Sequence, residues 1–502
     1  MDVVIVGGGP NGMMLACELA LGGVRPIVLE RSTEPSEEPR SNGLVGQVVR
    51  MVDRRGLFER LSDRPGPPQP NSGYFMFAAM PLDLGLLDDS PLYNLPVPES
   101  TLVRVLAERA AALGAEIRRG HELTGLAQDD DGVALTVRGP AGRDYELRTR
   151  YVVGADGAHS PVRKAAGIGF PGVTYDRTTS RTAHAVVPHD RLDPTTGALE
   201  VPGHGPVLPF LPVRTARGGF SYAPLPGLPP LVATVEWDQP ASGEPLTFDE
   251  MRDSITRVLG VEVPIEPPPG EGPHVLRRIN GGSTRVADRY RDGRVFLVGD
   301  AAHVFAAGGT GLNLGLQDAI NLGWKLAAAI RGGADVLDTY AAERRPIADR
   351  AITYSQAQAA LLSPGDDITG LRRLFGELLT RSDVVRVLAD LVAGADVRHP
   401  VGDGAHPLAG WPAPDLTLRT AGGAVRLAEL VRGGTPLLID LSERGDLRAD
   451  GIEVVRATAD TDVSALLLRP DSYVVWASSE ARPDQEELRI AVERWFGVPA
   501  DA

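Results

Sequence analysis

Short hydrophobic runs recur along the chain, and each stops at a glycine or at an acidic residue. They occupy residues 3–6, 27–29, 151–153 and 295–298. The first and the last are followed by segments with helical spacing of apolar residues. Buried strands that alternate with helices are typical of α/β proteins, so the pattern predicts an α/β domain.

The first hydrophobic run leads directly into the glycine motif GGGPNG. Gly7 allows a tight turn, Gly9 lets the backbone approach a pyrophosphate, and Gly12 permits close packing of the next helix. The second run ends at Glu30, whose carboxylate can accept hydrogen bonds from both hydroxyls of a ribose. An isolated GxGxxG also occurs in ordinary glycine turns. The strand, helix and acid around this one favour dinucleotide binding, and the acid argues against a 2′-phosphate at this position.

Two later turns have a related form. Residues 151–163, YVVGADGAHSPVR, place Asp156 directly after a strand, although Asp-Gly alone is a common turn. Residues 294–326 predict a strand, a turn at Asp300, a glycine loop and a helix that begins near Leu312. The start of such a helix presents unpaired N–H groups and about half a positive charge. It would stabilise a ring that becomes anionic on reduction.

With these three motifs in this order, the chain resembles the single-component FAD-dependent monooxygenases of the aromatic hydroxylase type (class A). The closest likeness is to hydroxylases of aromatic polyketides and to related antibiotic-inactivating, rifampicin-type monooxygenases. The resemblance implies an α/β fold with a glutathione-reductase-like, Rossmann-type FAD domain. It also implies an inserted, mostly antiparallel β-sheet substrate domain and a C-terminal thioredoxin-like α/β domain.

The resemblance assigns cofactor roles to individual residues. Asp156 would lie where FAD meets the nicotinamide donor, Asp300 would bind the ribityl chain, and Arg40 would lie near the pyrophosphate or the flavin. Surface salt bridges are the alternative explanation for Arg40 and for Arg163. The full set of implied FAD residues is Gly7, Gly9, Gly12, Glu30, Arg31, Arg40, Glu99, Asp156, Asp300, Gly309, Gly311, Leu312 and Asn313.

The chain also departs from the family pattern. Glu99 and Val103 stand where the family usually has Gln and Glu, and a negative Glu99 beside the flavin would disfavour the anionic reduced ring. The loop after GDAAH has Phe305, Ala306 and Ala307 where the family tends to have prolines. That loop normally packs where oxygen and substrate meet the flavin.

The resemblance and the composition together divide the chain into three parts. Residues 1–72, 99–176 and 275–398 are expected to form the FAD domain, with a helix over 102–113 and a small β-meander over 116–119, 132–138 and 145–148. Residues 73–98 and 177–274 are expected to form the substrate domain. Residues 399–502 are expected to form the thioredoxin-like part, which has no cysteine and for which a packing or homodimer-forming role is expected.

Aromatic residues in the expected substrate domain are candidates for the pocket wall. Strand alternation alone leaves open which of them face inward, and core packing is an alternative for each. The candidates are Phe75, Phe77, Phe210, Tyr222 and Trp237.

Composition excludes several other functions. A net charge of -15 argues against a nucleic-acid partner, and the single cysteine, Cys17, excludes a disulfide or a cysteine metal site. The scattered histidines indicate no metal. Without a basic leader or a long apolar run, the chain is expected to be cytoplasmic and not membrane-bound.

The implied activity is NAD(P)H- and O2-dependent hydroxylation of a phenolic polyketide-type polycycle through a C4a-hydroperoxyflavin. No residue is identified as a catalytic base. The alternatives are an antibiotic-modifying or Baeyer–Villiger-type monooxygenase, or a flavin-binding protein that sequesters an intermediate without oxygenating it.

Overall fold

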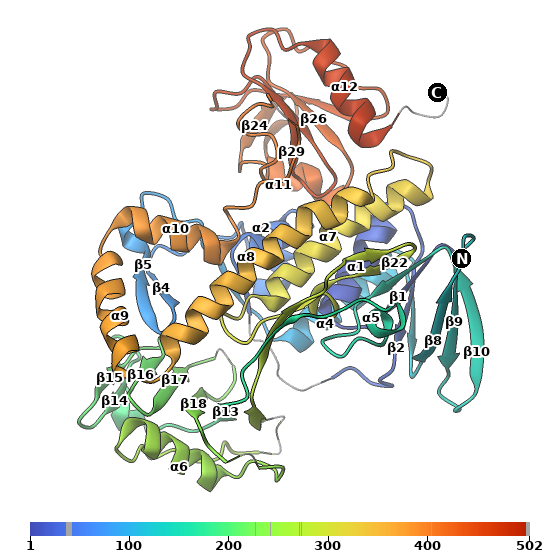
Figure 1. Ribbon diagram of the computed structural model, residues 1–502. Coiled ribbons are helices and arrows are strands. Elements are labelled where there is room, and N and C mark those ends of the chain that lie inside the picture. Colours follow the sequence, from blue (N-terminus) through green and yellow to red (C-terminus); the bar gives the residue numbers. More distant parts are fainter. Residues whose placement is uncertain are drawn as a thin grey trace.

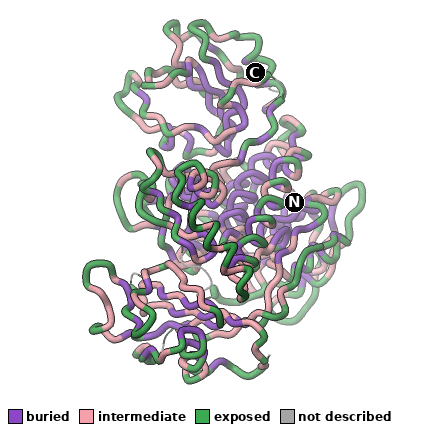
Figure 2. The backbone as a smooth tube through the Cα atoms, turned by 60° about the vertical axis from the view of Figure 1, so that its left-hand side comes forward, coloured by how far each residue is buried: buried purple, intermediate pink, exposed green. Residues whose placement is uncertain are grey.

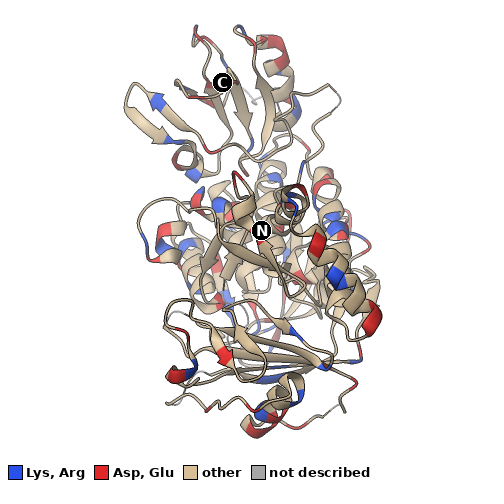
Figure 3. Cartoon of the chain, turned by 90° about the vertical axis from the view of Figure 1, so that its left-hand side faces the viewer, with Lys and Arg blue, Asp and Glu red and all other residues tan. Residues whose placement is uncertain are grey.

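The structure, a computed structural model, describes residues 1–36, 43–225, 227–240, 242–270, 272, 274–402 and 404–497. Three layers follow one another from bottom to top in Figure 1: a sheet domain with helix α6, a central α/β body, and a C-terminal unit that ends in α12. Figure 2 shows buried backbone in all three, with the largest share in the central body. Charged residues lie mostly on helices and loops, with acidic and basic positions intermixed (Figure 3).

A six-stranded sheet forms the middle of the central body. Its order is β21-β22-β11-β1-β2-β7, and all neighbours pair in parallel except β21 and β22. The strands are β1 (Val3–Val6), β2 (Ile27–Glu30), β7 (Glu116–Arg119), β11 (Tyr151–Gly154), β21 (Arg291–Asp292) and β22 (Val295–Leu297). The expectation that residues 116–119 belong to the β-meander is therefore wrong. Val28 pairs with Ile117, so β7 extends the parallel sheet.

The β-meander itself is present as a separate three-stranded sheet. It contains β8 (Glu122–Gln128), β9 (Val133–Arg138) and β10 (Asp144–Thr149). Helix α4 (Glu99–Ala112) comes before β7 in the chain. It begins three residues before the expected helix over 102–113 and ends one residue earlier than expected.

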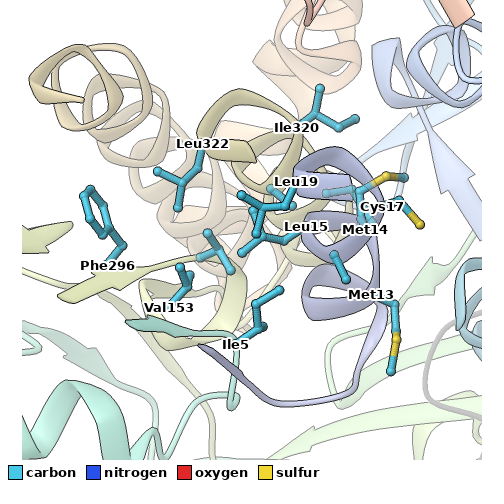
Figure 4. Packing of buried hydrophobic residues seen from close by; sticks show 14 of the residues in the cluster. Ile5, Met13, Met14, Leu15, Cys17, Leu19, Val153, Phe296, Ile320 and Leu322 are labelled. Atoms are coloured by element: carbon cyan, nitrogen blue, oxygen red, sulfur yellow. The ribbon is translucent and has the colours of Figure 1, made fainter. Parts of the chain in front are cut away.

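Two helices, α1 (Pro10–Leu21) and α7 (Gly311–Ile330), pack against each other beside the sheet. Figure 4 shows their apolar side chains, including Leu15 and Ile320, meeting those of the strands. Glycines allow the close approach: a Cβ on Gly323 would lie 2.4 Å from Cβ of Glu18, and one on Gly315 would lie 2.4 Å from Nδ2 of Asn11. The close packing brings the N-terminal ends of both helices to the same side of the molecule.

Helix α8 (Asp338–Leu362) crosses the central body and is followed by α9 (Asp366–Leu378) and α10 (Ser382–Ala393). The hairpin of β4 (Tyr74–Phe77) and β5 (Met80–Asp83) packs against these three helices in one hydrophobic cluster. Shorter elements complete the central body: β3 (Gly43–Val45), α2 (Gln47–Asp53), α3 (Phe58–Ser62), β6 (Asn94–Pro96), α5 (Pro161–Ala165), β12 (Gly172–Thr174), β20 (Ser283–Val286), η3 (Gly299–Ala301) and β23 (His303–Val304).

The lower domain contains an antiparallel sheet with the order β16-β17-β18-β13-β19. Helix α6 (Phe248–Leu259) covers one face, so alternate residues such as Phe220, Tyr222 and Val232 are buried against Met251 and Ile255. The other face points toward the central body (Figure 1). The strands are β13 (Thr178–His184), β16 (Val213–Arg214), β17 (Gly218–Ala223), β18 (Leu231–Trp237) and β19 (Leu276–Asn280).

The C-terminal unit has a four-stranded sheet of order β27-β26-β28-β29 and a helix, α12 (Gln485–Phe496). Its strands are β26 (Leu437–Asp440), β27 (Glu453–Arg456), β28 (Ala465–Leu468) and β29 (Val474–Ser478). The pair β26 and β27 is parallel, and the other pairs are antiparallel.

A buried charge cluster joins this unit to the central body. Glu343 on α8 accepts hydrogen bonds from Arg469 and from Lys325, both at 2.7 Å. Arg469 also pairs with Asp471 at 2.6 Å, and each of these four side chains is no more than 1% exposed. Burial opposes the charge of Glu343, but Arg469 and Lys325 hold the pKa of its carboxyl well below the usual value. Burial lowers the pKa of Lys325 to about 7, and the two parts are thus connected by a cluster of ion pairs that water does not reach.

Candidate functional site

A cavity of about 420 Å³ opens where the strands β1, β2 and β11 end. It lies between the glycine turn, the Asp156 turn and the start of α7. Eight of the residues predicted to bind FAD line it: Gly7, Gly9, Glu30, Arg31, Glu99, Asp156, Asp300 and Leu312. Residues far apart in the sequence therefore meet at one edge of the parallel sheet, which is where α/β proteins bind ligands.

The three glycines of the first motif differ in their surroundings. Gly7 has a φ of +112°, and a Cβ there would lie 2.3 Å from the carbonyl oxygen of Ala155. A Cβ on Gly12 would lie 2.0 Å from the carbonyl oxygen of Gly7, whereas a Cβ on Gly9 would meet nothing within 4 Å. Gly7 and Gly12 are thus required by protein packing, and Gly9 leaves open space on the cavity wall.

Glu30 is held in place by backbone groups. Gly8 N–H donates to Oε2 at 2.7 Å, and Ser32 N–H donates to Oε1 at 2.8 Å. A carboxylate oxygen can accept more than one hydrogen bond, so both oxygens keep acceptor capacity toward the cavity. The side chain is positioned before any ligand arrives.

The second motif forms a compact turn fixed by Arg163. The Arg163 side chain donates to the carbonyl oxygens of Ala301 at 2.8 Å and Ala158 at 2.9 Å and lies over the ring of Phe170. It is buried, so it forms no surface salt bridge and instead joins the second motif to the third. Asp156 accepts from Val162 N–H at 2.9 Å through Oδ2.

Asp156 also carries an unsatisfied atom. Its Oδ1 is buried and has no hydrogen-bond partner among the described residues, and burial raises the pKa of the carboxyl. Asn11, which also lines the cavity, has a buried Oδ1 without a described partner. Such atoms favour a polar ligand in the cavity.

The third motif is supported from behind. His303 Nε2 lies 2.7 Å from Oδ2 of Asp318, and Arg344 donates to Oδ1 of Asp318 at 2.7 Å. Burial opposes the charge of Asp318, but Arg344 and His303 hold the pKa of its carboxyl below the usual value. This network lies under the turn, since Gly299 N–H donates to Asp318, and Asp300 is exposed toward the cavity.

The start of α7 matches the sequence prediction to within one residue. Gly311 is its first residue, and a Cβ there would lie 3.5 Å from Oδ1 of Asp300. Gly309 has a φ of +63° in the preceding loop. Asn313 does not line the 420 Å³ cavity: its Oδ1 accepts from Val45 N–H at 3.1 Å, and it borders a second cavity of about 270 Å³ between α7, α8 and the end of α10.

The loop that lacks the expected prolines is fixed by hydrogen bonds. Ala306 N–H donates to Oγ1 of Thr284 at 3.1 Å, and Ala307 N–H donates to Oγ of Ser355 at 3.2 Å. The two hydroxyls lie 3.1 Å apart, and the rings of His303 and Phe305 stack. Proline has no N–H and could not form these bonds. In this chain, hydrogen bonds from Ala306 and Ala307 restrain the loop, in place of the rigid proline rings that are usual in the family.

The predicted pocket aromatics fall into different environments. Tyr222 is buried against α6, and Phe77 packs against Tyr354 and Phe375, each with a centroid distance of 5.6 Å. These two side chains belong to hydrophobic cores and not to a pocket wall. Trp237 and Phe75 are half-buried, and Phe210 is 51% exposed with a φ of +62°.

Trp237 lies on the sheet face opposite α6, because its neighbour Glu236 is buried on the α6 side. Several other residues on this face of the central strands are small by comparison with Trp237, namely Thr178, Ser180, Thr182, Ser221, Ala233 and Val235, whereas His184 and Leu231 at one end are larger. Short side chains therefore occupy much of the sheet face opposite α6.

Sequence reasoning missed three polar residues of the cavity, Asn11, His121 and Glu122. His121 follows β7, and its Nδ1 lies 2.8 Å from the Tyr145 hydroxyl. Recognising 116–119 as a third parallel strand would have pointed to the residues after it. Arg40 lies outside the described residues. Within the described part of the chain no cluster of acidic, histidine or cysteine side chains could hold a metal ion, and no helix has the length and apolar character of a membrane span.

These features fit a dinucleotide. The open space at Gly9 would accommodate a pyrophosphate, the fixed carboxylate of Glu30 a ribose, and the start of α7 an electron-rich ring.

The chain matches two protein families. Residues 1–355 match the family described as "FAD binding domain", and residues 406–499 match "Aromatic-ring hydroxylase, C-terminal". A rifampicin monooxygenase from Streptomyces venezuelae is 40% identical over 511 residues, which cover 99% of each chain. A dialkyldecalin synthase from Streptomyces rugosporus is 36% identical over 512 residues, again 99% of each. The solved structure of OxyS anhydrotetracycline hydroxylase from Streptomyces rimosus has 38% identity, a TM-score of 0.84 and 99% coverage of both chains.

Proposed function

This chain belongs to the FAD-binding aromatic-ring hydroxylases, as its three motifs predicted, and we propose that it hydroxylates a phenolic, polyketide-type polycycle. NAD(P)H would be the electron donor and O2 the oxygen source, by way of the C4a-hydroperoxyflavin expected above. The observation that carries this proposal is the single cavity where the glycine turn, Asp156 and Asp300 meet the start of α7.

The roles proposed for the cavity residues follow from their positions. Gly9 leaves space for the pyrophosphate, Glu30 accepts from the ribose hydroxyls, and Asp300 accepts from the ribityl chain. The backbone at Gly311, Leu312 and Asn313 donates toward the pyrimidine edge of the flavin. Bound FAD supplies the redox chemistry; the protein binds, orients and excludes water.

The substrate is proposed to bind between the flavin and the sheet face opposite α6. The small side chains Ser180, Thr182 and Ala233 support this location, because a flat polycycle needs room along the sheet. Trp237 on the same face would provide an aromatic contact. The C-terminal unit, residues 399–502, is proposed to be a thioredoxin-like packing domain that takes no part in redox chemistry. Homodimer formation is the alternative role proposed for it.

A single experiment tests the main proposal. FAD-loaded protein is mixed with NADPH or NADH, O2 and a panel of phenolic polycycles, and the products are analysed by mass spectrometry. We expect substrate-dependent consumption of the donor and a product heavier by one oxygen atom, labelled when ¹⁸O2 is used. Donor consumption without any oxygenated product from the whole panel would contradict the proposal.

Two other outcomes have specific support. The rifampicin monooxygenase relative favours the modification of a finished antibiotic. The other outcome is a Baeyer–Villiger reaction, in which the oxygen atom is inserted beside a ketone of the substrate. Adding rifampicin and ketone-bearing polycycles to the panel distinguishes these from phenol hydroxylation.

The second candidate function is a flavin protein that does not oxygenate its ligand. A relative named as a dialkyldecalin synthase, together with Glu99 at the cavity, supports it. A negative charge near the flavin would disfavour reduction. In this case a polyene or phenolic ligand would bind to the oxidised protein and be retained or converted at unchanged mass, with no donor consumed.

A further inference from the structure

A groove of about 620 Å³ lies between α9 and the β4–β5 hairpin, on the side of the molecule that Figure 3 turns toward the viewer. Three arginines line it: Arg214 from β16, and Arg372 and Arg373 from α9. Asp83 is the carboxylate on its wall. The groove is cationic in a protein whose net charge is -15.

The guanidinium groups of Arg214 and Arg372 are fixed by backbone oxygens. Arg214 donates to the carbonyl oxygen of Ser363 at 2.6 and 3.0 Å, and Arg372 donates to those of Ala78 at 2.5 Å and Ala79 at 2.9 Å. Carbonyl oxygens hold a guanidinium in place but do not neutralise its charge. Neither arginine forms an ion pair with any described carboxylate.

The two fixed arginines line the same groove, and their positive charges repel each other. Burial lowers the pKa of Arg214, and burial together with the charge of Arg214 lowers the pKa of Arg372. Asp83 keeps one negative charge on the wall, where its Oδ1 accepts from Gly85 N–H at 2.9 Å to cap a short turn, so the three arginines leave the groove with an excess of positive charge. Arg373 is exposed at the same groove and has no hydrogen bond or ion pair within the described part of the chain.

The groove is linked to the loop beside the expected flavin site. Arg372 binds the carbonyl of Ala78, and the N–H of Ala78 donates to Oε1 of Gln358 at 3.0 Å. The amide of Gln358 in turn borders Gly308, where a Cβ would lie 2.5 Å from Nε2. Apolar side chains, Met80 and Leu379 among them, form one part of the remaining wall, and Thr369 and Thr380 form another.

We propose that this groove binds the carboxylate or phosphate group of a small molecule. Arg373 offers its guanidinium donors to such an oxyanion, and Arg214 and Arg372 add fixed positive charge whose mutual repulsion a bound anion would relieve. The apolar wall suits an organic ligand that carries the anion. The site is independent of the oxygenation chemistry proposed above, because anion binding requires no reduced flavin.

The test uses FAD-loaded, oxidised protein and inorganic phosphate as the probe, measured by calorimetry at low salt. Arg373 is the residue to change, because Arg214 and Arg372 also hold the backbone. We expect one saturable site, weakened about fivefold by Arg373→Gln, the upper range for an exposed ion pair, and lost in Arg373→Glu. Arg25→Gln, which removes an exposed arginine elsewhere, should bind as the unmodified protein does.

The source of the anion is then distinguished with NADP⁺ and salicylate. Weaker NADP⁺ binding in Arg373→Glu assigns the site to a phosphate of the nicotinamide donor, and weaker salicylate binding assigns it to a carboxylate on the substrate. If Arg373→Glu binds phosphate, NADP⁺ and salicylate as tightly as the unmodified protein, or if Arg25→Gln is weakened equally, the proposal is wrong.

Discussion

The cavity at the parallel-sheet edge and the open face of the five-stranded sheet are built in different ways. The cavity is formed largely by backbone and by short motifs: Gly9 leaves open space, Gly8 N–H holds Glu30, and Val162 N–H holds Asp156. The sheet face is formed by alternate side chains of several strands, such as Ser180, Ala233 and Trp237. Substitutions can change the sheet face without disturbing the backbone, whereas the cavity tolerates little change. One scaffold can thus keep its cofactor while its substrate varies.

The largest effects are expected within the glycine motif. Gly12→Ala should destabilise the fold by about 3 kcal/mol, because the added methyl overlaps the carbonyl of Gly7. Gly9→Ala should leave the unfolding free energy of the FAD-free protein unchanged, since its Cβ meets nothing and its φ of -74° suits alanine, yet FAD binding should be lost. Urea unfolding and flavin absorbance separate the two effects. Equal destabilisation by both substitutions would contradict the distinction between them.

Substitutions on the two faces of the five-stranded sheet should have different effects, because α6 covers only one of them. Tyr222→Ala should cost about 3 kcal/mol of stability by removing a buried ring, with flavin content preserved in the protein that remains folded. Trp237→Ala should cost much less stability and raise the KM for the polycyclic substrate. Thermal unfolding and steady-state kinetics measure these changes. A Tyr222→Ala protein of normal stability with a raised KM would reverse the assignment of the faces.

An intermediate effect is expected at Asp300. Removing its carboxylate in Asp300→Ala should weaken FAD binding by about 1.5–3 kcal/mol, or roughly 10- to 100-fold, as for a hydrogen bond to a charged group. Asp300→Asn serves as the size-matched control and should retain part of the affinity. The dissociation constant is obtained by titrating FAD-free protein with FAD. An Asp300→Ala protein that remains fully yellow would place the ribityl contact elsewhere.

The smallest effect concerns Glu99. If it is charged beside the ring, Glu99→Gln removes a negative charge and should raise the flavin reduction potential by on the order of 30 mV, or about 1.4 kcal/mol for two electrons. Redox titration measures the shift. An exposed carboxylate away from the cavity, Glu480, provides the control in Glu480→Gln, which should leave the potential unchanged.

The difference between the cavity and the sheet face also explains which features could be predicted from the sequence. Contiguous motifs specify their own turns, so the start of α7 and the positions of Glu30 and Asp156 followed from local spacing. Features that depend on contacts between distant residues could not be predicted. Packing between distant segments determines three features that no local sequence pattern indicates. They are the parallel pairing of β7, the burial of Arg163 between two motifs, and the face of the sheet that α6 covers.

The buried charge cluster between Glu343, Lys325, Arg469 and Asp471 limits how this protein could be divided or recombined. Cutting the chain before residue 399 would leave Glu343 without Arg469 and would expose the surface of the central body that the C-terminal unit now covers. Removing one member of a buried ion pair typically costs about 3–5 kcal/mol. The C-terminal unit is therefore no detachable module, and a chimera with a related enzyme would have to exchange both sides of this junction together.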